Sequence, residues 1–376
     1  MAKILATAKQ RGSVNAIVGA VDTLLERGHR VDIYATGKDN EAMGFGDRKY
    51  LRMKNPSVRD AKNALQGYDL LVVGLTGRDT ADGTFTYAAN NLGIASVGVN
   101  DQNSNYVERF GDSIEGIPQR ISLMNDVCLG TIFEELPKEI AEAVKERSRV
   151  LGWTAFDGLY SLRERKSTFD KESFLNGLRE REIEIPEKVY FHGTQNVPGT
   201  GHFGYEVRAA EEIMRTASNL GLNLVIKPHP GEESGRFSKL LAERYGHTFI
   251  PADSCDTKEL MLASDLVTAG RSTMLEEACV LDINVGGIFT QVGAKELGEC
   301  LEFYGDFWRN ISSVASGAIP YVIKSEEIGG LFSSLATEDP SELEKLALDR
   351  EKFSVDGKAS ERLADLVEET LNSPSS

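Results

Sequence analysis

The stretch AGRSTMLEEA, residues 269–278, joins a short apolar segment to a helical pattern. Gly270 lets the backbone turn where a side chain would clash. Ser272 and Thr273 place hydroxyls and backbone N–H groups at the expected start of a helix, where the helix dipole favours an anion. The guanidinium of Arg271 can fork onto a phosphate, although an ordinary surface arginine is an equally good interpretation. The stretch therefore predicts a site for a nucleotide diphosphate at the end of a strand.

Two acidic residues follow one helical turn later. Glu276 and Glu277 would lie within reach of a ribose if a phosphate occupied the turn. One of them would accept hydrogen bonds from the ribose hydroxyls while the other faces solvent or the helix cap. The alternative is structural, because Thr273 and Glu276 have the spacing of a capping box. A cap and an anion site are compatible, since a well-formed helix start is what binds the anion.

Length, charge and cysteine spacing exclude several classes of protein. With 376 residues the chain is long enough for two domains, each with its own core. Its formal net charge of -16 argues against a nucleic-acid partner, which would require a basic surface. Its Cys residues are scattered, without the close pairs that bind zinc. We therefore expect a globular protein with no structural metal.

The sequence also lacks the patterns of a membrane or secreted protein. No apolar run approaches the ~20 residues that span a bilayer. The first residues open a strand and lack the apolar region and cleavage site of a signal peptide. We therefore expect a cytoplasmic protein with no transmembrane segment.

Strand and helix patterns alternate along the chain. A short apolar strand at residues 3–7 precedes the turn GSVN at residues 12–15 and a helix expected over residues 16–27. A second strand follows at residues 30–34, and this strand–helix–strand order is typical of a parallel sheet. A second run of the same kind begins near residue 188. We therefore predict an α/β fold with two Rossmann-like domains.

The domain boundaries follow from a change in character between the two runs. Charged helical patterns near residues 138–149 and 171–181 separate them. We place the N-terminal domain at residues 1–165 and the C-terminal domain at residues 166–345. A helical segment, residues 346–376, closes the chain.

Four segments, taken in order, resemble the GT-B superfamily. They are the N-terminal strand, turn and helix ending in ERGHRV, the segment KPHP at 227–230, the loop and helix at 270–278, and DGKASERL at 356–363. Within that superfamily they are most similar to UDP-N-acetylglucosamine 2-epimerases and CDP-glycerol or other capsule-type transferases. The resemblance covers nearly the whole chain. It implies two Rossmann-like domains with parallel sheets facing across a cleft, the nucleotide on the C-terminal domain, and the last helix packed on the first domain.

The resemblance implies further nucleotide contacts in the second half. Similar Lys-Pro-His-Pro segments in capsule-type transferases contact the nucleotide phosphates, which would give that role to Lys227 and His229. The alternative is a turn histidine that bonds its own loop. His192, Gly193 and Thr194 follow the first strand of this half, where backbone N–H groups of a loop can close on a diphosphate. A plain surface loop is the alternative there.

In the first half, the sequence indicates an acceptor or phosphate site at the start of the first helix. Gly12, Ser13 and Asn15 open that helix, and its N-terminus would favour an anion. Asn15 fits equally well as a helix cap.

The sequence offers three candidates for the catalytic group. An inverting transferase needs a general base for the acceptor proton, usually from the N-terminal domain. Asp101 follows the strand expected at residues 95–99, and we predict it as the base. Asp79 and Asp82, after the strand at residues 69–73, are the alternatives. Any of the three fits equally as a helix cap.

Two segments depart from the epimerase pattern. Residues 118–120, Pro-Gln-Arg, stand where the epimerases have a catalytic acid within Pro-Glu-Glu. Asn100 and Asp101 replace a Val-Glu-Ala-Gly stretch, and an amide cannot exchange a proton as an acid does. These departures favour a transferase over an epimerase.

We therefore predict a glycosyltransferase-like enzyme that needs no metal and no cofactor. Its donor would be a UDP- or CDP-linked sugar or polyol phosphate, and its acceptor a small molecule or a glycan. The alternatives are an isomerase of the 2-epimerase type and a nucleotide-sugar-binding protein that has lost catalysis. A homodimer is left open.

Overall fold

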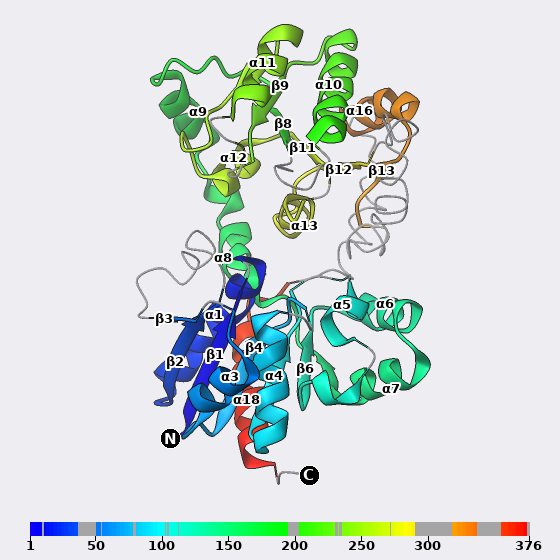
Figure 1. Ribbon diagram of the computed structural model, residues 1–376. Coiled ribbons are helices and arrows are strands. Elements are labelled where there is room, and N and C mark those ends of the chain that lie inside the picture. Colours follow the sequence, from blue (N-terminus) through cyan, green and yellow to red (C-terminus); the bar gives the residue numbers. More distant parts are fainter. Residues whose placement is uncertain are drawn as a thin grey trace. The chain divides into compact units, whose positions relative to one another are not determined.

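A computed structural model provides the structure of the chain (Figure 1). It describes residues 1–9, 11–36, 50–53, 55–77, 80–101, 103, 105–111, 113–194, 203–229, 232, 235–270, 272–289, 318–336 and 355–373. The chain divides into two compact units. Unit 1 comprises Met1–Tyr160 with Val355–Ser376, and unit 2 comprises Ser161–Ser354.

Unit 1 is built on a seven-stranded parallel sheet. Its strands lie in the order β3-β2-β1-β4-β5-β6-β7. Their bounds are β1 Lys3–Ala8, β2 Arg30–Ala35, β3 Leu51–Arg52, β4 Leu70–Gly74, β5 Ala95–Val99, β6 Arg120–Leu123 and β7 Ser148–Val150. The order reverses between β1 and β4, as in a Rossmann sheet, and ligands bind such sheets at the carboxyl ends beside this switch point.

Helices cover both faces of this sheet. They are α1 Arg11–Glu26, α3 Val58–Leu65, α4 Ala81–Leu92, α5 Tyr106–Phe110, α6 Val127–Glu135, α7 Lys138–Arg147 and α18 Ala359–Asn372, with short 3-10 turns η2 Ile114–Gly116 and η3 Thr154–Phe156. Helix α8 Asp157–Glu164 follows η3 in the chain. Helices α1 and α18 pack on each other and on the central strands, whereas α4 packs on β4 and β5 and contacts α3. Helix α8 spans the boundary between the two units.

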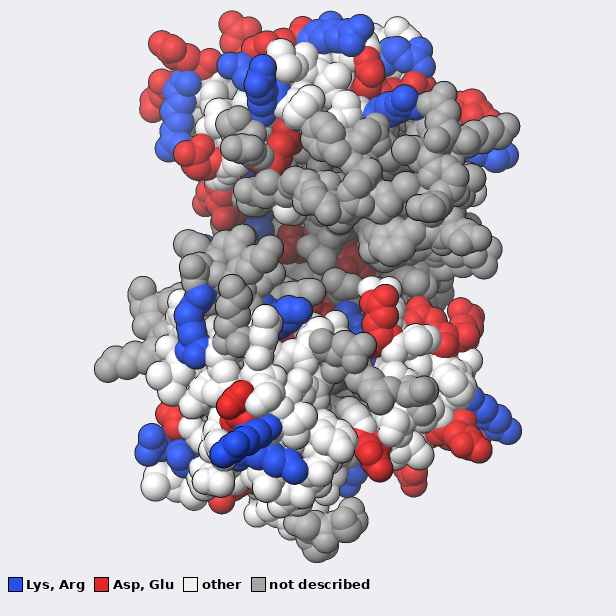
Figure 2. Space-filling view, in the orientation of Figure 1, with Lys and Arg blue, Asp and Glu red and all other residues white. Residues whose placement is uncertain are grey.

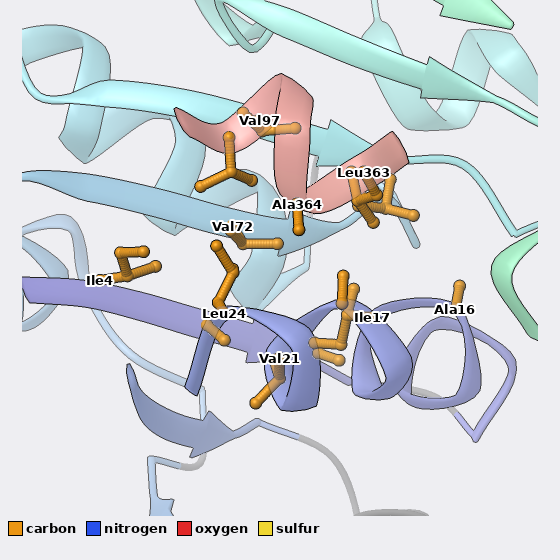
Figure 3. Packing of buried hydrophobic residues seen from close by; sticks show 14 of the residues in the cluster. Ile4, Ala16, Ile17, Val21, Leu24, Val72, Val97, Leu363 and Ala364 are labelled. Atoms are coloured by element: carbon orange, nitrogen blue, oxygen red, sulfur yellow. The ribbon is translucent and has the colours of Figure 1, made fainter. Parts of the chain in front are cut away.

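The last helix completes the core of unit 1. Leu363 and Ala364 of α18 are fully buried in one cluster with Ile17 and Val21 of α1 and Val72 of β4 (Figure 3). The start of α18 is held by Asp157, whose carboxylate accepts the Ala359 and Ser360 N–H groups at 3.0 and 2.6 Å. Residues far apart in the sequence thus share one apolar layer, which stabilises unit 1 by burial.

Unit 2 repeats the same plan with six parallel strands. Their order is β10-β9-β8-β11-β12-β13, which again reverses at its centre, between β8 and β11. The strands are β8 Tyr190–Gly193, β9 Leu224–Lys227, β10 Thr248–Phe249, β11 Leu266–Ala269, β12 Val285–Ile288 and β13 Tyr321–Val322. The helices are α9 Lys171–Arg179, α10 Phe203–Asn219, α11 Arg236–Tyr245, α12 Thr257–Ala263, α13 Met274–Val280 and α16 Ile328–Ala336, with the 3-10 turns η4 Lys166–Thr168 and η8 Ser325–Glu327.

The predicted α/β architecture with two parallel sheets is confirmed, with local differences. The expected turn at residues 12–15 is the first part of α1, which begins at Arg11. This helix ends where predicted, because Gly28 has φ 85° and takes up the left-handed conformation that stops a helix. The short strands β3 and β7 were not predicted, since two or three residues carry no periodic pattern.

We expect Leu363→Ala to destabilise unit 1 by about 2–5 kcal/mol, because it removes a fully buried side chain from the α1–α18 layer. Urea unfolding followed by circular dichroism measures the change. Leu25→Ala on α1 is the matched control, since Leu25 is 44% exposed and its loss should cost little. Equal stability losses for the two variants would contradict this account of the core.

Candidate functional site

The structure brings the predicted nucleotide residues of unit 2 to one edge of its sheet. In the β8–β11 pairing, His192 lies opposite Thr268 and Gly193 opposite Ala269. On its other side Gly193 lies opposite Lys227 of β9. The carboxyl ends of β8, β9 and β11 therefore meet at the switch point. Gly270 and the start of α13 follow directly from this edge.

Helix α13 approaches this edge closely. A Cβ atom on Gly193 would lie 2.5 Å from the Met274 thioether, so glycine leaves room for the first residue of the helix. Gly193 is the last residue of β8, not part of the following loop as predicted. Its role in the structure is close packing between strand and helix.

His192 is a buried neutral side chain. Its Nδ1 lies 3.0 Å from the Thr268 hydroxyl, and only 3% of the residue is exposed. Burial, and to a lesser degree the nearby His247, lower the pKa of His192 to about 4. His192 is therefore uncharged at pH 7 and positions β8 against β11, but adds no positive charge for a phosphate.

The loop after β9 is held by a network that the sequence did not reveal. Ser238 donates its hydroxyl to Glu232 at 2.6 Å and its N–H to the same carboxylate at 2.9 Å. Thr194, the first residue after β8, accepts the His229 N–H at 3.2 Å and lies 3.1 Å from the Ser238 hydroxyl. Glu232 follows the KPHP segment closely, but only the fold brings Ser238 and Thr194 to it.

The two residues predicted to contact phosphates after β9 differ in exposure. The His229 side chain is exposed, on a backbone tied to Thr194. Lys227 is 6% exposed, and its ammonium donates to the Ala252 carbonyl. His229 is therefore exposed at this edge, whereas the Lys227 ammonium is bonded to the β10–α12 loop.

The start of α13 differs in detail from the predicted capping box. Thr273 is the N-cap residue but makes no side-chain capping bond, and the Ser272 hydroxyl accepts the Met274 N–H at 3.2 Å instead. The capping-box interpretation is therefore wrong for Thr273 and Glu276. Glu276 is 5% exposed, whereas Glu277 is partly accessible. Arg271 lies outside the described residues.

Unit 1 presents a second set of polar groups at the carboxyl ends of its strands. Asp101, after β5, is buried and forms an ion pair with Arg109 at 2.8 Å. Arg109 also donates to the Leu75 carbonyl after β4. A Cβ atom on Gly12 would lie 2.8 Å from the other Asp101 oxygen, so the glycine lets α1 approach this carboxylate. Asp101 is thus held from both sides, and no sequence motif identified Arg109 as its partner.

The other predicted residues of α1 differ in accessibility. Ser13 is fully buried, and Asn15 is exposed on the helix. Asn15 is the fifth residue of α1, so it is not the cap. Gly12 and Asn15 face solvent at the start of the helix, and Ser13 packs beneath them against Gly74 of β4.

Asp82 is the most perturbed acid in the described residues of this edge. The hydroxyls of Thr76 and Thr36 donate to its two oxygens at 2.5 and 3.2 Å. Burial is the largest effect and raises the pKa of Asp82 to about 7; the charge of Asp101 also raises it, whereas the two hydroxyls and Lys9 lower it. Asp82 can therefore hold or release a proton near neutral pH. Asp79 lies outside the described residues.

Several buried polar atoms beside this edge find no hydrogen-bond partner among the described residues. They are Thr7 Oγ1 at the end of β1, and Asn100 Oδ1 and Asn103 Nδ2 after β5. The rest of this cluster is bonded, since Asn100 Nδ2 and Asn103 Oδ1 both meet the Tyr106 hydroxyl. Unsatisfied buried groups are uncommon in folded proteins and mark sites of strain, bound water or function.

The Pro-Gln-Arg segment at residues 118–120 lies at the opposite edge. Arg120 is the first residue of β6, so the segment precedes that strand. The neutral and basic residues of this segment therefore lie at the amino end of β6, away from the carboxyl edge that holds Asp101. At that position these residues give no reason to prefer a transferase over an epimerase.

Other classes of site receive no support from the described residues. They contain no group of three or more His, Cys, Asp or Glu side chains arranged to hold a metal ion. None of the helices formed by these residues has both the length and the apolar character needed to cross a bilayer. On the face shown in Figure 2, basic and acidic side chains of the described residues are interspersed, with no continuous basic surface.

Comparison with known proteins identifies the fold. No protein-family model and no curated protein sequence matches the chain. Among solved structures, the UDP-GlcNAc 2-epimerase of Neisseria meningitidis bound to UDP-GlcNAc superposes with a TM-score of 0.65 at 15% identity, over 98% of this chain and 100% of that chain. MurG of Acinetobacter baumannii gives 0.59 at 13% identity, over 98% and 100%. The wall teichoic acid polymerase TagF gives 0.56 at 13% identity, over 98% and 88%.

These neighbours share the GT-B fold, and the chain has that fold. The predicted resemblance to the branch that holds the epimerases and the CDP-glycerol-type transferases is confirmed at the level of structure. At these identities the likeness establishes the fold and leaves the activity to be argued from the site.

We expect Asp82→Asn to change how stability depends on pH. The folded wild type holds a proton on Asp82 up to about pH 7, whereas the unfolded chain releases it near pH 4. The contribution of Asp82 to the free energy of unfolding of the wild type is therefore complete below pH 4 and is lost as the pH rises to 7. The asparagine variant should gain on the wild type between pH 5 and pH 8, by on the order of a few kcal/mol.

Urea unfolding of both proteins at the two pH values measures this difference. Asp126→Asn is the control, because Asp126 is exposed and makes no side-chain capping bond. An Asp82→Asn curve parallel to the wild type across this range would show that Asp82 does not titrate there.

Proposed function

We propose that the chain is an enzyme acting on a nucleotide-activated sugar, with the nucleotide bound at the carboxyl edge of unit 2. One observation carries the proposal. Residues selected for phosphate and ribose contacts converge on the switch point between β8 and β11. They do so in a fold shared with an epimerase solved with UDP-GlcNAc bound. Switch points of Rossmann sheets are where such ligands bind.

The diphosphate would lie against the turn from β11 into α13. Gly270 follows β11 directly, and the Ser272 and Thr273 hydroxyls stand at the start of the helix. The exposed imidazole of His229 lies on the loop fixed by Thr194 and Glu232, at the same edge. Backbone N–H groups, hydroxyls and an imidazole are suitable ligands for a diphosphate without a metal ion.

The ribose would be held by Glu277. Of the two glutamates, Glu276 is nearly fully buried, whereas Glu277 is partly accessible. Only the accessible carboxylate can accept ribose hydroxyls without repacking the helix. Glu276 then belongs to the interior of unit 2.

Acid–base chemistry would come from the carboxyl edge of unit 1. Asp101 was selected from the sequence, but its carboxylate is held by Arg109 and packed against Gly12. Asp82 has a pKa of about 7, where a general acid or base works best. We therefore propose Asp82 as the proton-holding group and Asp101 as the charge that, beside it, keeps that proton in place.

The reaction we propose is transfer of a sugar or polyol phosphate from a UDP- or CDP-linked donor to a small molecule or glycan. The second candidate is epimerisation of UDP-N-acetylglucosamine. It is favoured by the number of epimerases among the structural neighbours. The position of residues 118–120 at the far edge also removes one reason against it. The two reactions share the nucleotide site and differ in the need for an acceptor.

Glu277→Ala should lower UDP affinity about tenfold to hundredfold, because it removes charge-assisted hydrogen bonds to the ribose. Isothermal titration of UDP in EDTA measures the change and tests metal independence at the same time. Glu259→Ala on the neighbouring helix α12 is the matched control, since it removes an exposed carboxylate from the same unit. Wild-type UDP affinity in Glu277→Ala would contradict the ribose assignment.

UDP-N-acetylglucosamine incubated with the protein alone separates the two reactions. A transferase without acceptor should leave the compound intact, whereas an epimerase should release its epimer or free UDP. We expect intact donor together with measurable binding. Epimer formation would replace the transferase by the epimerase, and a donor that neither binds nor reacts would contradict the proposed function.

A further inference from the structure

Unit 1 contains a pocket at the edge opposite the candidate site. It lies at the amino-terminal ends of β5, β6 and β7, where their parallel register brings Ile121 opposite Ser148. Its volume is about 470 Å³. Its lining includes Ile94 and Ile114 as apolar surface, and Arg120 and Arg147 as basic groups. Pockets of this size hold small organic molecules.

The two arginines are neighbours because of the strand register. Arg120 and Arg147 directly precede Ile121 and Ser148, which are paired. Each guanidinium is fixed by backbone carbonyls, Arg147 by those of Ile117 at 3.0 Å and Pro118 at 3.4 Å, and Arg120 by that of Gln119 at 3.2 Å. Each keeps further N–H donors for a ligand, since a guanidinium has five.

No described carboxylate forms an ion pair with either arginine. Arg109, Arg149 and Arg362 in the same unit do pair with acids. Two glutamates, Glu115 and Glu146, also line the pocket, but both are exposed and neither comes within ion-pair distance.

Without a bound anion, the burial of Arg147 and the like charge of Arg120 both disfavour the charged form of the Arg147 guanidinium. Burial lowers the pKa of the Arg147 guanidinium, Glu146 raises it, and the like charge of Arg120 lowers it again. Two adjacent guanidinium groups with no ion pair to a described carboxylate contrast with the net charge of -16 of the chain. An oxyanion between them would remove the repulsion and form paired hydrogen bonds.

The pocket walls are already in place. Asn90, near the end of α4, donates to the carbonyls of Glu115 at 2.7 Å and Ile117 at 3.1 Å. Gly93 ends α4 beside the pocket and caps its last carbonyls with its own N–H. The segment before β6 is therefore tied to α4 on one side and to Arg147 on the other, so a ligand would meet a preformed surface.

We propose that this pocket binds a small organic anion through a phosphate or carboxylate group placed between Arg120 and Arg147. Ile94 and Ile114 would contact the rest of the molecule. Because sugar nucleotides bind Rossmann sheets at the carboxyl edge, the pocket is a site separate from the proposed nucleotide site. The anion would therefore be a second ligand of the protein.

Hydrogen–deuterium exchange with pyrophosphate and with citrate as probes tests this site, against sodium chloride at equal ionic strength. We expect one or both probes to slow exchange in residues 113–121 and 143–149. Slowing by pyrophosphate alone identifies a phosphate ligand, and slowing by citrate alone a carboxylate. No slowing by either probe at tens of millimolar would overturn the proposal.

Variants locate the effect. Arg120→Ala should abolish the protection, and Arg147→Lys, which keeps a charge but loses the fork, should weaken probe binding at least tenfold. Arg59→Ala, an exposed arginine on α3, should leave it unchanged. Protection that persists in Arg120→Ala and Arg147→Lys would overturn the proposal. UDP affinity should be unchanged in Arg120→Ala, so failure here and failure of the nucleotide site remain distinguishable.

Discussion

The pairing of β8 with β11 is the constraint on which the candidate site depends. Their register places His192 beside Thr268 and Gly193 beside Ala269, although these residues are far apart in the sequence. The buried His192–Thr268 contact and the close packing of Met274 on Gly193 join the strand ends to α13. A shift by one residue would turn every side chain of β8 to the other face and separate the groups proposed to hold the nucleotide.

The sheet of unit 1 has the same type of strand order, and charged side chains gather at both of its edges. Its carboxyl edge buries two acids close together in different surroundings. Asp101 forms an ion pair with Arg109, whereas the described hydrogen-bond partners of the Asp82 carboxyl are the Thr36 and Thr76 hydroxyls. Burial raises the pKa of Asp82 to about 7. At the amino edge the sheet does the reverse and places Arg120 beside Arg147. Strand register places the two arginines side by side, whereas the two acids are brought together by the start of α4 and the segment after β5.

Much of the fold could be predicted from the sequence, and the site only in part. Apolar runs such as residues 95–99 and 265–268 predicted buried parallel strands, and the Gly270 turn correctly preceded a helix. The capping box failed because Ser272, not Thr273, bonds the first helical N–H. Arg109, Ser238 and Glu232 were missed, because their partners are set by the packing of loops and not by any local pattern. Residues 118–120 precede β6, and a short motif gives no indication of the sheet edge on which it lies.

A crystal structure with UDP tests the central claim most directly. The account predicts the diphosphate within hydrogen-bond distance of the turn at Gly270–Thr273, the ribose hydroxyls on Glu277, and His229 beside the phosphates. UDP bound at another place on the chain, or its absence from this edge at saturating concentration, would contradict the account.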